Sequence, residues 1–251
     1  MDLFNIQNST QEVAEAISAV LNVDVTIVDI HLNRVAATGE YKNLIGRSLP
    51  KNCAFESIAN KRKPEFIDNP NISQKCKGCS LRGSCAEMAT VGYPILNGED
   101  LLGVIGLIAF NMEQKKKLQR EYHSLIIFLS KLGDLLAGNL KYANTIMDLT
   151  IQTEETKMII DGLGNGIICT DNLGNIKFVN LKAEDYLKVD GNNIINKSIF
   201  EIVPNLRLDF KEYVPIETKL TIDNKRESFI IKVIPVMLQE KNVSNIIEIH
   251  K

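Results

Sequence analysis

The 251-residue sequence has no tryptophan, few aromatic residues of any kind, and no long apolar segment. A membrane-spanning helix needs about 20 consecutive apolar residues. The most apolar stretch, Leu101 to Phe110, is too short and contains two glycines. The first residues, Met1 to Asn5, lack the basic start and apolar centre of a signal peptide. We therefore expect a protein that does not enter the membrane and works in the cytoplasm.

The sequence also lacks a strong excess of charge, since its formal net charge is −2 at pH 7. Such a balance provides no general attraction to DNA or to an anionic membrane. The basic run Lys115 to Lys117 has no accompanying aromatic or glycine pattern of a nucleic-acid binder, and we interpret it as a solvated helix face. We expect no direct nucleic-acid binding by this segment.

Catalytic signatures are missing as well. No Gly-x-x-x-x-Gly-Lys-Ser/Thr loop is present, so ATP hydrolysis is not supported. The three histidines, His31, His123 and His250, are isolated, and His123 lacks the acidic neighbour that usually follows the phosphorylated histidine of a kinase. We expect the chain not to be an enzyme.

The first half of the sequence alternates helical and strand periodicity around one long irregular stretch. Helical spacing of apolar residues covers 8–21 and 54–60, and strand patterns cover 23–30, 34–39, 91–96 and 101–108. The last two strands are joined by an Asn-Gly turn and predict a hairpin. Residues 68–86 follow neither period, and a loop of that length in a compact domain is usually functional.

A long helix is predicted over about 112–155. Its apolar residues follow a 3–4 alternation that is typical of a helical dimer interface. The residues of this predicted seam are Leu118, Tyr122, Leu125, Leu129, Leu132, Leu136, Ala143, Met147 and Thr150. We expect a homodimer through this helix; the alternative is that its early part packs on its own domain and only the later part pairs.

The last third begins with an apolar helix end, then a Gly-Ile-Ile-x-x-Asp strand, an Asn/Gly turn and Ile-x-Phe-Val-Asn before a helix. Strand patterns follow over 214–222 and 228–236. This order resembles a PAS domain, over residues 155–251. Asn180 occupies a position common in PAS-like sequences, and we expect its side chain to hold the strand-to-helix turn. The glycines at 162, 164 and 166 are interpreted as a flexible lead into this domain, because their spacing and order differ from those of a nucleotide loop.

Residues 1–140 are similar to a GAF domain, on the strength of the first helix, the first hairpin, the Gly-Tyr-Pro-Ile strand and the Leu-Leu-Gly-Val-Ile-Gly strand. The predicted fold class is therefore α+β, with two antiparallel-sheet sensory domains joined by a long helix. A GAF-like domain followed by a PAS-like domain resembles the N-terminal half of bacterial regulators that act with sigma-54 RNA polymerase. The resemblance implies that output is made by a downstream ATPase and DNA-binding domain, or by a partner chain.

Four of the five cysteines, Cys53, Cys76, Cys79 and Cys85, form the pattern C-x22-C-x2-C-x5-C. Cytoplasmic cysteines are kept reduced, so such a group indicates metal or redox chemistry rather than disulfides. Two cysteines separated by two residues can face one ion across a tight turn, and thiolates suit zinc and iron–sulfur clusters. Nearby positive residues are expected to lower the thiol pKa values; these are Lys75, Lys77 and Arg82.

The identity of the bound group stays open between a [4Fe-4S] cluster, which we favour, and zinc. Structural zinc sites commonly use two close ligand pairs, whereas this pattern has one close pair, a third cysteine and a distant fourth. In ligand spacing alone the pattern is similar to the WhiB-like regulators, which hold a [4Fe-4S] cluster. The fifth cysteine, Cys169, is expected to be a small core residue.

The leading hypothesis is a sensory module that reports redox state, gas or iron through the cluster. One alternative is a regulator that binds a small ligand in a GAF or PAS pocket while zinc staples the loop. Another is a thiol switch made by Cys76 and Cys79, although the strand-then-helix setting of thioredoxin-like enzymes is missing.

Overall fold

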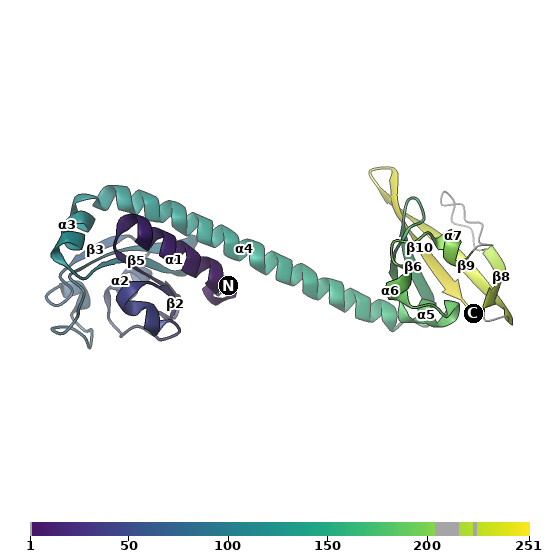
Figure 1. Cartoon of the computed structure of the whole chain (residues 1–251), viewed down its shortest axis with the longest axis horizontal. Coiled ribbons are helices and arrows are strands. Elements are labelled where there is room, and N and C mark those ends of the chain that lie inside the picture. The colour runs from purple at the N-terminus through teal and green to yellow at the C-terminus, as the bar shows by residue number, and fades with distance from the viewer. Residues whose placement is uncertain (1, 204–215, 223–224) are drawn as a thin grey trace. The chain divides into compact units, whose positions relative to one another are not determined.

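The computed structural model describes residues 2–203, 216–222 and 225–251. It separates into two compact units, Met1–Asp148 and Leu149–Lys251. Each unit is built on an antiparallel five-stranded sheet, and a long helix runs from the first unit into the second (Figure 1). The predicted α+β class, with two antiparallel sheets and a long helix, is confirmed. Within the described parts of the chain, no helix combines the length and apolar character needed to cross a membrane.

The first unit contains the predicted helices and hairpins with small changes at their ends. Its elements are η1 (Leu3–Ile6), α1 (Gln7–Leu21), β1 (Asp24–Asp29), β2 (Arg34–Ala37), η2 (Gly39–Leu44), α2 (Ala54–Lys61), β3 (Glu65–Asp68), η3 (Gln74–Cys76), β4 (Ala89–Asn97), β5 (Asp100–Ala109), α3 (Met112–Arg120) and α4 (Tyr122–Asp161). The strand expected over 34–39 ends earlier, because Gly39 has a φ of 50° and starts η2.

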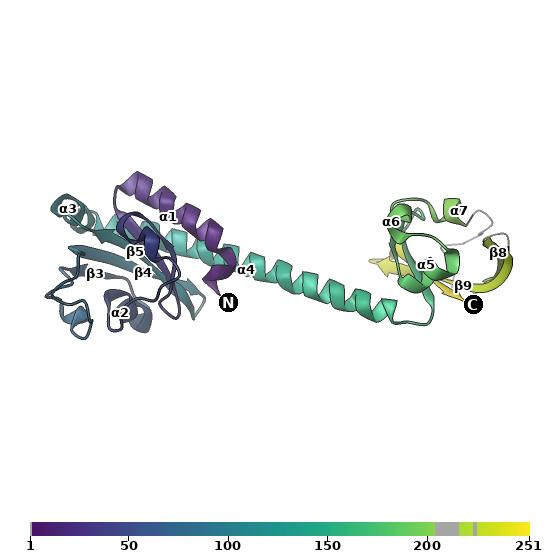
Figure 2. The same ribbon diagram turned by 60° about the horizontal axis from the view of Figure 1, so that its bottom comes forward.

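The strands of this sheet lie in the order β2-β1-β5-β4-β3. One face is covered by α1 and by the first part of α4, and the opposite face is covered by α2 (Figures 1 and 2). Phe55 of α2 packs directly over Gly106 of β5, where an added Cβ would come within 2.4 Å of the aromatic ring. The glycine thus allows α2, and the cysteine that precedes it, to lie close to the sheet.

The long helix differs from its prediction in two ways. It is interrupted at Glu121, which separates α3 from α4. The predicted dimer seam is wrong in its early part, because Leu118, Leu125, Leu129 and Leu136 are buried in the core of the first unit. These residues have the spacing of a helix–helix seam, but they pack against the sheet of their own domain.

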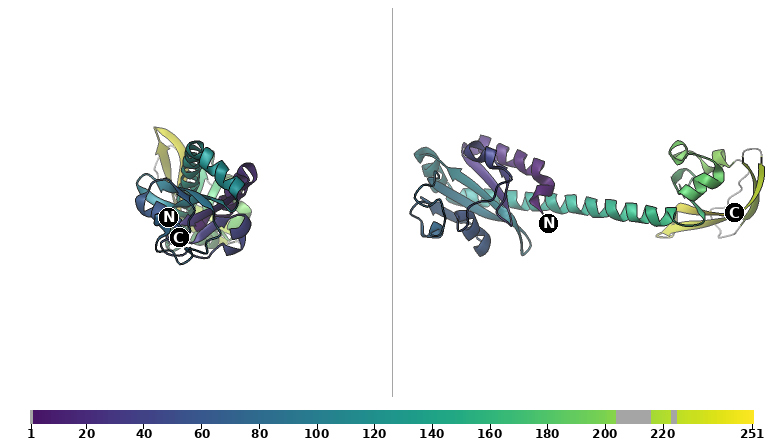
Figure 3. Two further views of the ribbon diagram at one scale, coloured as in Figure 1. Left: turned by 90° about the vertical axis from the view of Figure 1, so that its left-hand side faces the viewer. Right: turned by 90° about the horizontal axis from the view of Figure 1, so that it is seen from below.

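The second unit has the same strand order as the first, β7-β6-β10-β9-β8. Its elements are β6 (Gly166–Asp171), β7 (Ile176–Val179), α5 (Leu181–Leu187), α6 (Gly191–Ile194), α7 (Ile199–Ile202), β8 (Ile216–Ile222), β9 (Lys225–Leu238) and β10 (Lys241–His250). The short helices lie over one face of this sheet (Figure 2 and the right-hand view of Figure 3, green against yellow). Of the strand expected over 214–222, residues 214 and 215 lie outside the described residues.

Candidate functional site: a four-cysteine cavity

Cys53 immediately precedes α2 and is almost fully buried. Burial, the largest influence, raises the pKa of its thiol, although the nearby backbone N–H groups of Glu56 and Phe55 act in the opposite direction. A sulfur at the N-terminus of a helix meets unpaired N–H groups and the positive end of the helix dipole. The position therefore favours a thiolate once a metal replaces the proton.

The Cys-x-x-Cys pair lies at the end of η3. Ser73 caps this short helix by accepting a hydrogen bond from the Lys75 backbone N–H at 3.3 Å. The Cys79 N–H donates to the Cys76 carbonyl at 3.1 Å and closes the turn between the two cysteines. Cys76 is buried and Cys79 is partly exposed. Burial, followed by the nearby Cys79 and Cys53, raises the pKa of Cys76 to about 11.

Asn52 brings Cys53 and the Cys-x-x-Cys turn together. Its side-chain amide donates to the Gly78 carbonyl at 3.3 Å. The fit is tight, since a Cβ on Gly78 would lie 2.9 Å from the Asn52 side chain. A glycine between the two cysteines is therefore favoured by this close approach.

Cys85 is held from the opposite end of the loop by Asn71. The Cys85 N–H donates to Asn71 Oδ1 at 2.8 Å, and Asn71 Nδ2 donates to the Cys85 carbonyl at 2.9 Å. Arg82 closes the same loop, donating from Nε to the Asn71 carbonyl and from Nη2 to the Ile72 carbonyl, both at 3.3 Å. The stretch thus has a defined internal hydrogen-bond framework, although η3 is its one short helix between β3 and β4.

All four predicted cysteines line one cavity of about 40 Å³ in the first unit. The residues around it are Arg34, Tyr41, Leu49, Pro50, Cys53, Ala54, Phe55, Pro70, Cys76, Cys79, Leu81, Arg82, Cys85 and Glu87. The thiols are close enough to raise one another's pKa values, as Cys79 does for Cys53, Cys76 and Cys85. Among the described residues, however, no three His, Cys, Asp or Glu side chains already stand in an arrangement that could hold a metal ion. The donor chemistry fits a thiophilic metal, and ligation requires the loop to draw its sulfurs closer.

The expectation that Lys75, Lys77 and Arg82 lower the thiol pKa values is wrong. Burial is the largest influence on Cys53, Cys76 and Cys85, and it raises the pKa of all three. Lys75 forms an ion pair with Glu65 at 3.5 Å, and Arg82 donates to the loop carbonyls. Lys75 and Arg82 thus support the loop and are not among the causes that shift these three pKa values.

Three wall residues of the cavity were not indicated by the cysteine pattern: Arg34, Tyr41 and Glu87. The Arg34 guanidinium lies over the Tyr41 ring, 4.6 Å from its centroid. The Tyr41 hydroxyl donates to Glu87 Oε1 at 3.0 Å. Burial, with Glu87 second, raises the pKa of Tyr41, so the phenol stays protonated and keeps donating. An arginine at the start of a buried strand is the one sequence signal that could have drawn attention to this group.

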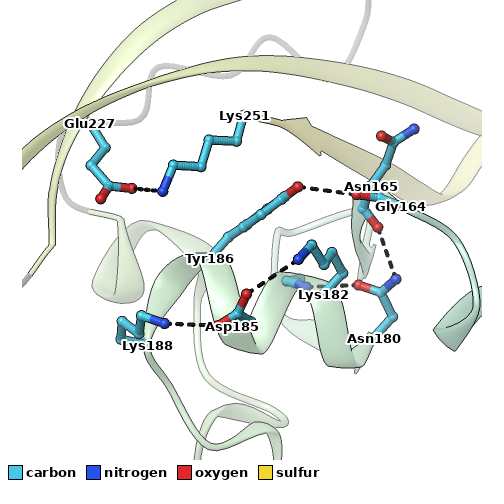
Figure 4. Close-up of polar contacts among 10 residues, drawn as sticks. Gly164, Asn165, Asn180, Lys182, Asp185, Tyr186, Lys188, Glu227 and Lys251 are labelled. Atoms are coloured by element: carbon cyan, nitrogen blue, oxygen red, sulfur yellow. Dashed lines mark hydrogen bonds and ion pairs between the residues drawn. The ribbon is translucent and has the colours of Figure 1, made fainter.

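The other two expected positions lie in the second unit. Asn180 is fully buried and caps α5, so its predicted role in the strand-to-helix turn is confirmed. Its Oδ1 accepts from Ile167 N at 2.7 Å and Ala183 N at 2.9 Å, and its Nδ2 donates to the Ile160 and Asn165 carbonyls, each at 3.0 Å (Figure 4 shows the contact with Asn165). Cys169 lies in β6 and is half-buried, less enclosed than the core position expected for it.

Comparison with known proteins gives one sequence relative and a similar solved structure, whereas no family model matches the chain. UacR of Escherichia coli K12, provisionally assigned as a uric acid sigma-54-dependent transcriptional regulator, is 29% identical over 198 residues, which are 78% of this chain and 33% of UacR. The DhaR(N) part of the E. coli DhaR(N)-DhaL complex superimposes with a TM-score of 0.63 at 16% identity, covering 99% of this chain and 85% of that chain.

A shorter match is the PAS domain of nitrogen regulation protein NR(II) from Vibrio parahaemolyticus, at 16% identity and a TM-score of 0.33. It covers 38% of this chain and 96% of that domain. The chain thus spans about a third of the length of its curated relative, is homologous to a sigma-54-dependent regulator, and shares its fold with DhaR(N).

Proposed function

We propose that this chain is the sensory part of a sigma-54-dependent transcriptional regulator, acting in the cytoplasm, and that it senses through a [4Fe-4S] cluster bound by Cys53, Cys76, Cys79 and Cys85. The observation that supports this most directly is the single cavity that all four cysteines line. The sequence relation to UacR supports the regulatory context. The resulting signal is redox state, a gas or the supply of iron, because each of these changes or removes such a cluster.

Binding would order the loop around the metal. Cys79 and Cys85 are partly exposed and lie on a stretch without regular structure, whereas Cys53 and Cys76 are buried against α2 and the sheet. The two fixed sulfurs would receive the metal, and the two looser ones would close over it. Loss of the metal would release the loop again, so that occupancy is converted into a change of shape on the first unit.

The first experiment is to purify the protein without oxygen, record its absorption spectrum, and measure iron, sulfide and zinc. A broad band near ~400 nm with about four iron and four sulfide per chain supports the cluster. Alanine substitution of each of the four cysteines should abolish that content, whereas Cys169→Ala is the matched control and should retain it. A colourless protein with one zinc per chain would contradict redox sensing and favour the structural-zinc alternative. The thiol switch would be favoured if the protein holds no metal and its response to oxidant needs only Cys76 and Cys79.

We also propose that two copies of the chain associate through α4, along a face that differs from the predicted seam. Phe128, Leu135 and Tyr142 are 37%, 51% and 70% exposed and recur every seven residues. A seven-residue apolar repeat matches the same repeat on a second helix and so favours a coiled-coil-like pair of identical helices. Light scattering coupled to size-exclusion chromatography should find a dimer that Leu135→Glu converts to a monomer. Val20→Glu, at a 76% exposed apolar position on α1, is the matched control and should remain dimeric.

The output would come from outside this segment. The chain corresponds to about a third of UacR, and regulators of the sigma-54 class are expected to add an ATPase and a DNA-binding domain. The fold neighbour DhaR(N) was solved in complex with a second protein, DhaL, so a partner chain is the alternative route for a signal.

A further inference from the structure

Arg34, the first residue of β2, is a buried cation on the wall of the cysteine cavity. It is 7% exposed, and its Nε lies buried with no hydrogen-bond partner among the residues that the structure describes. A buried, unpaired N–H normally costs free energy, so its retention calls for an explanation. The guanidinium lies over the Tyr41 ring, 4.6 Å from its centroid, and Arg34 lines the cavity that the four cysteines share.

The electrostatic surroundings of Arg34 show which groups it faces. Burial, the largest influence, lowers the pKa of the guanidinium, whereas Tyr41, Glu87 and Cys53 act in the opposite direction. An arginine keeps its charge even so. Glu87 is already engaged, since it accepts hydrogen bonds from Tyr41 at 3.0 Å and from Thr90 at 2.5 Å. Of the three groups that act on the pKa of Arg34, Cys53 is the one that is also a candidate metal ligand.

A buried four-thiolate site carries negative charge, and the Arg34 guanidinium is a positive group on the wall of the same cavity. Four thiolates around a doubly charged ion or cluster carry a net charge of about −2. Burying that charge beside apolar residues such as Leu49 and Phe55 is unfavourable without a counter-charge or hydrogen-bond donors. Arg82 lines the same cavity, but its guanidinium donates to the loop carbonyls.

We propose that Arg34 is the counter-charge and hydrogen-bond donor of the cysteine site, stabilising the bound thiolate–metal centre through its guanidinium and donating from Nε to a cysteine sulfur once the loop closes. Arg34 acts here as a positioning residue and not as a ligand. Outer-shell groups of this kind tune metal affinity, and their loss typically weakens binding about 10- to 100-fold. The inference rests on the proposed function, because it assumes that the four cysteines bind a metal.

The test is metal affinity measured on the whole chain, prepared metal-free under reducing, anaerobic conditions. Co²⁺ is titrated while its thiolate absorption is recorded, and Zn²⁺ affinity is obtained by competition with a chelator. Arg34→Gln should weaken binding about 10- to 100-fold. Arg34→Lys, which keeps the charge, should stay within a few-fold of wild type. Arg47→Gln, at an exposed arginine of the same unit, is the matched control and should bind as wild type does.

Each outcome separates the two proposals. If wild type binds neither ion and also purifies without iron and sulfide in the absence of oxygen, the metal function fails and the role of Arg34 fails with it. If wild type binds and a folded Arg34→Gln binds equally well, only the role of Arg34 is overturned. Equal weakening in Arg34→Lys and Arg34→Gln, with native circular dichroism, would overturn charge compensation as the cause. Should Arg34→Gln not fold, Arg34→Met gives the neutral comparison, since it fills the same space with an apolar side chain.

Discussion

Removing the Asn180 side chain should destabilise the second unit more than most single substitutions do. In Asn180→Ala, the backbone N–H groups of Ile167 and Ala183 lose their acceptor in a buried position. Loss of a helix cap costs about 1 kcal/mol, and a buried unsatisfied N–H costs about 1–3 kcal/mol. We expect the free energy of unfolding of this unit to fall by about 2–4 kcal/mol, a large share of the 5–15 kcal/mol typical of a domain.

The assay is urea unfolding followed by circular dichroism, because the chain has no tryptophan for fluorescence, together with hydrogen exchange of the Ile167 and Ala183 amides. Asn180→Asp separates the two halves of the network: it keeps the acceptor oxygen Oδ1, but a carboxylate oxygen replaces the amide nitrogen and cannot donate to the carbonyls of Ile160 and Asn165. In that variant α5 should stay capped while the end of α4 exchanges faster. Asn172→Ala, at an exposed turn residue, should change stability by less than about 0.5 kcal/mol. An Asn180→Ala protein as stable as this control would refute the reasoning.

Two further predictions concern the first unit. Gly106→Ala should lower its thermal midpoint, at a cost of about 1–3 kcal/mol, because the new Cβ would meet the Phe55 ring. Gly138→Ala is the control in the same unit, since its Cβ would meet nothing within 4 Å, and it should not lower the midpoint. Equal midpoints for the two variants would contradict the packing described. Burial raises the pKa of Glu65, but hydrogen bonds from Lys61 and Ser57 and the charge of Lys75 outweigh it and hold the pKa below its usual 4.5. Glu65 therefore stabilises the fold above about pH 4.5 and loses this effect as the pH falls through its folded-state pKa. Glu65→Gln should be destabilised at pH 7 and should approach wild type in acid, whereas a deficit independent of pH would show that the carboxylate charge is not responsible.

Periodicity was a good guide to the fold where one physical cause dominates. The helices at α1 and α2 and the hairpin of β4 and β5 follow from amphipathic spacing and an Asn-Gly turn. Periodicity was misleading along α4, because an apolar stripe shows that a helix face is buried but does not show which element buries it. Leu125 and Leu129 have the spacing of a helix pair, but they pack on the sheet of their own domain.

The cysteine pattern located the candidate site without describing its surroundings. Ligand spacing along the chain points to Cys76, Cys79 and Cys85, and the structure brings Cys53 to them through Asn52 and Gly78. Arg34, by contrast, reaches the cavity from β2, and no local pattern links it to a cysteine. The thiol pKa shifts were expected in the wrong direction for a related reason: positive neighbours are visible in a sequence, whereas burial is not.

The two units share one strand order and differ most clearly in the length of one connection between strands. Both open with an Asp-x-x-x-Asn hairpin, in which Asp29 binds Asn33 and Asp171 binds Asn175 through side chain and backbone alike. In the second unit β9 begins at Lys225, only three positions after β8 ends at Ile222. The corresponding connection in the first unit runs from Asp68 to Ala89 and contains three of the four candidate ligands. Because the shared topology does not require that long connection, its presence is better explained by the chemistry of its cysteines than by the stability of the sheet.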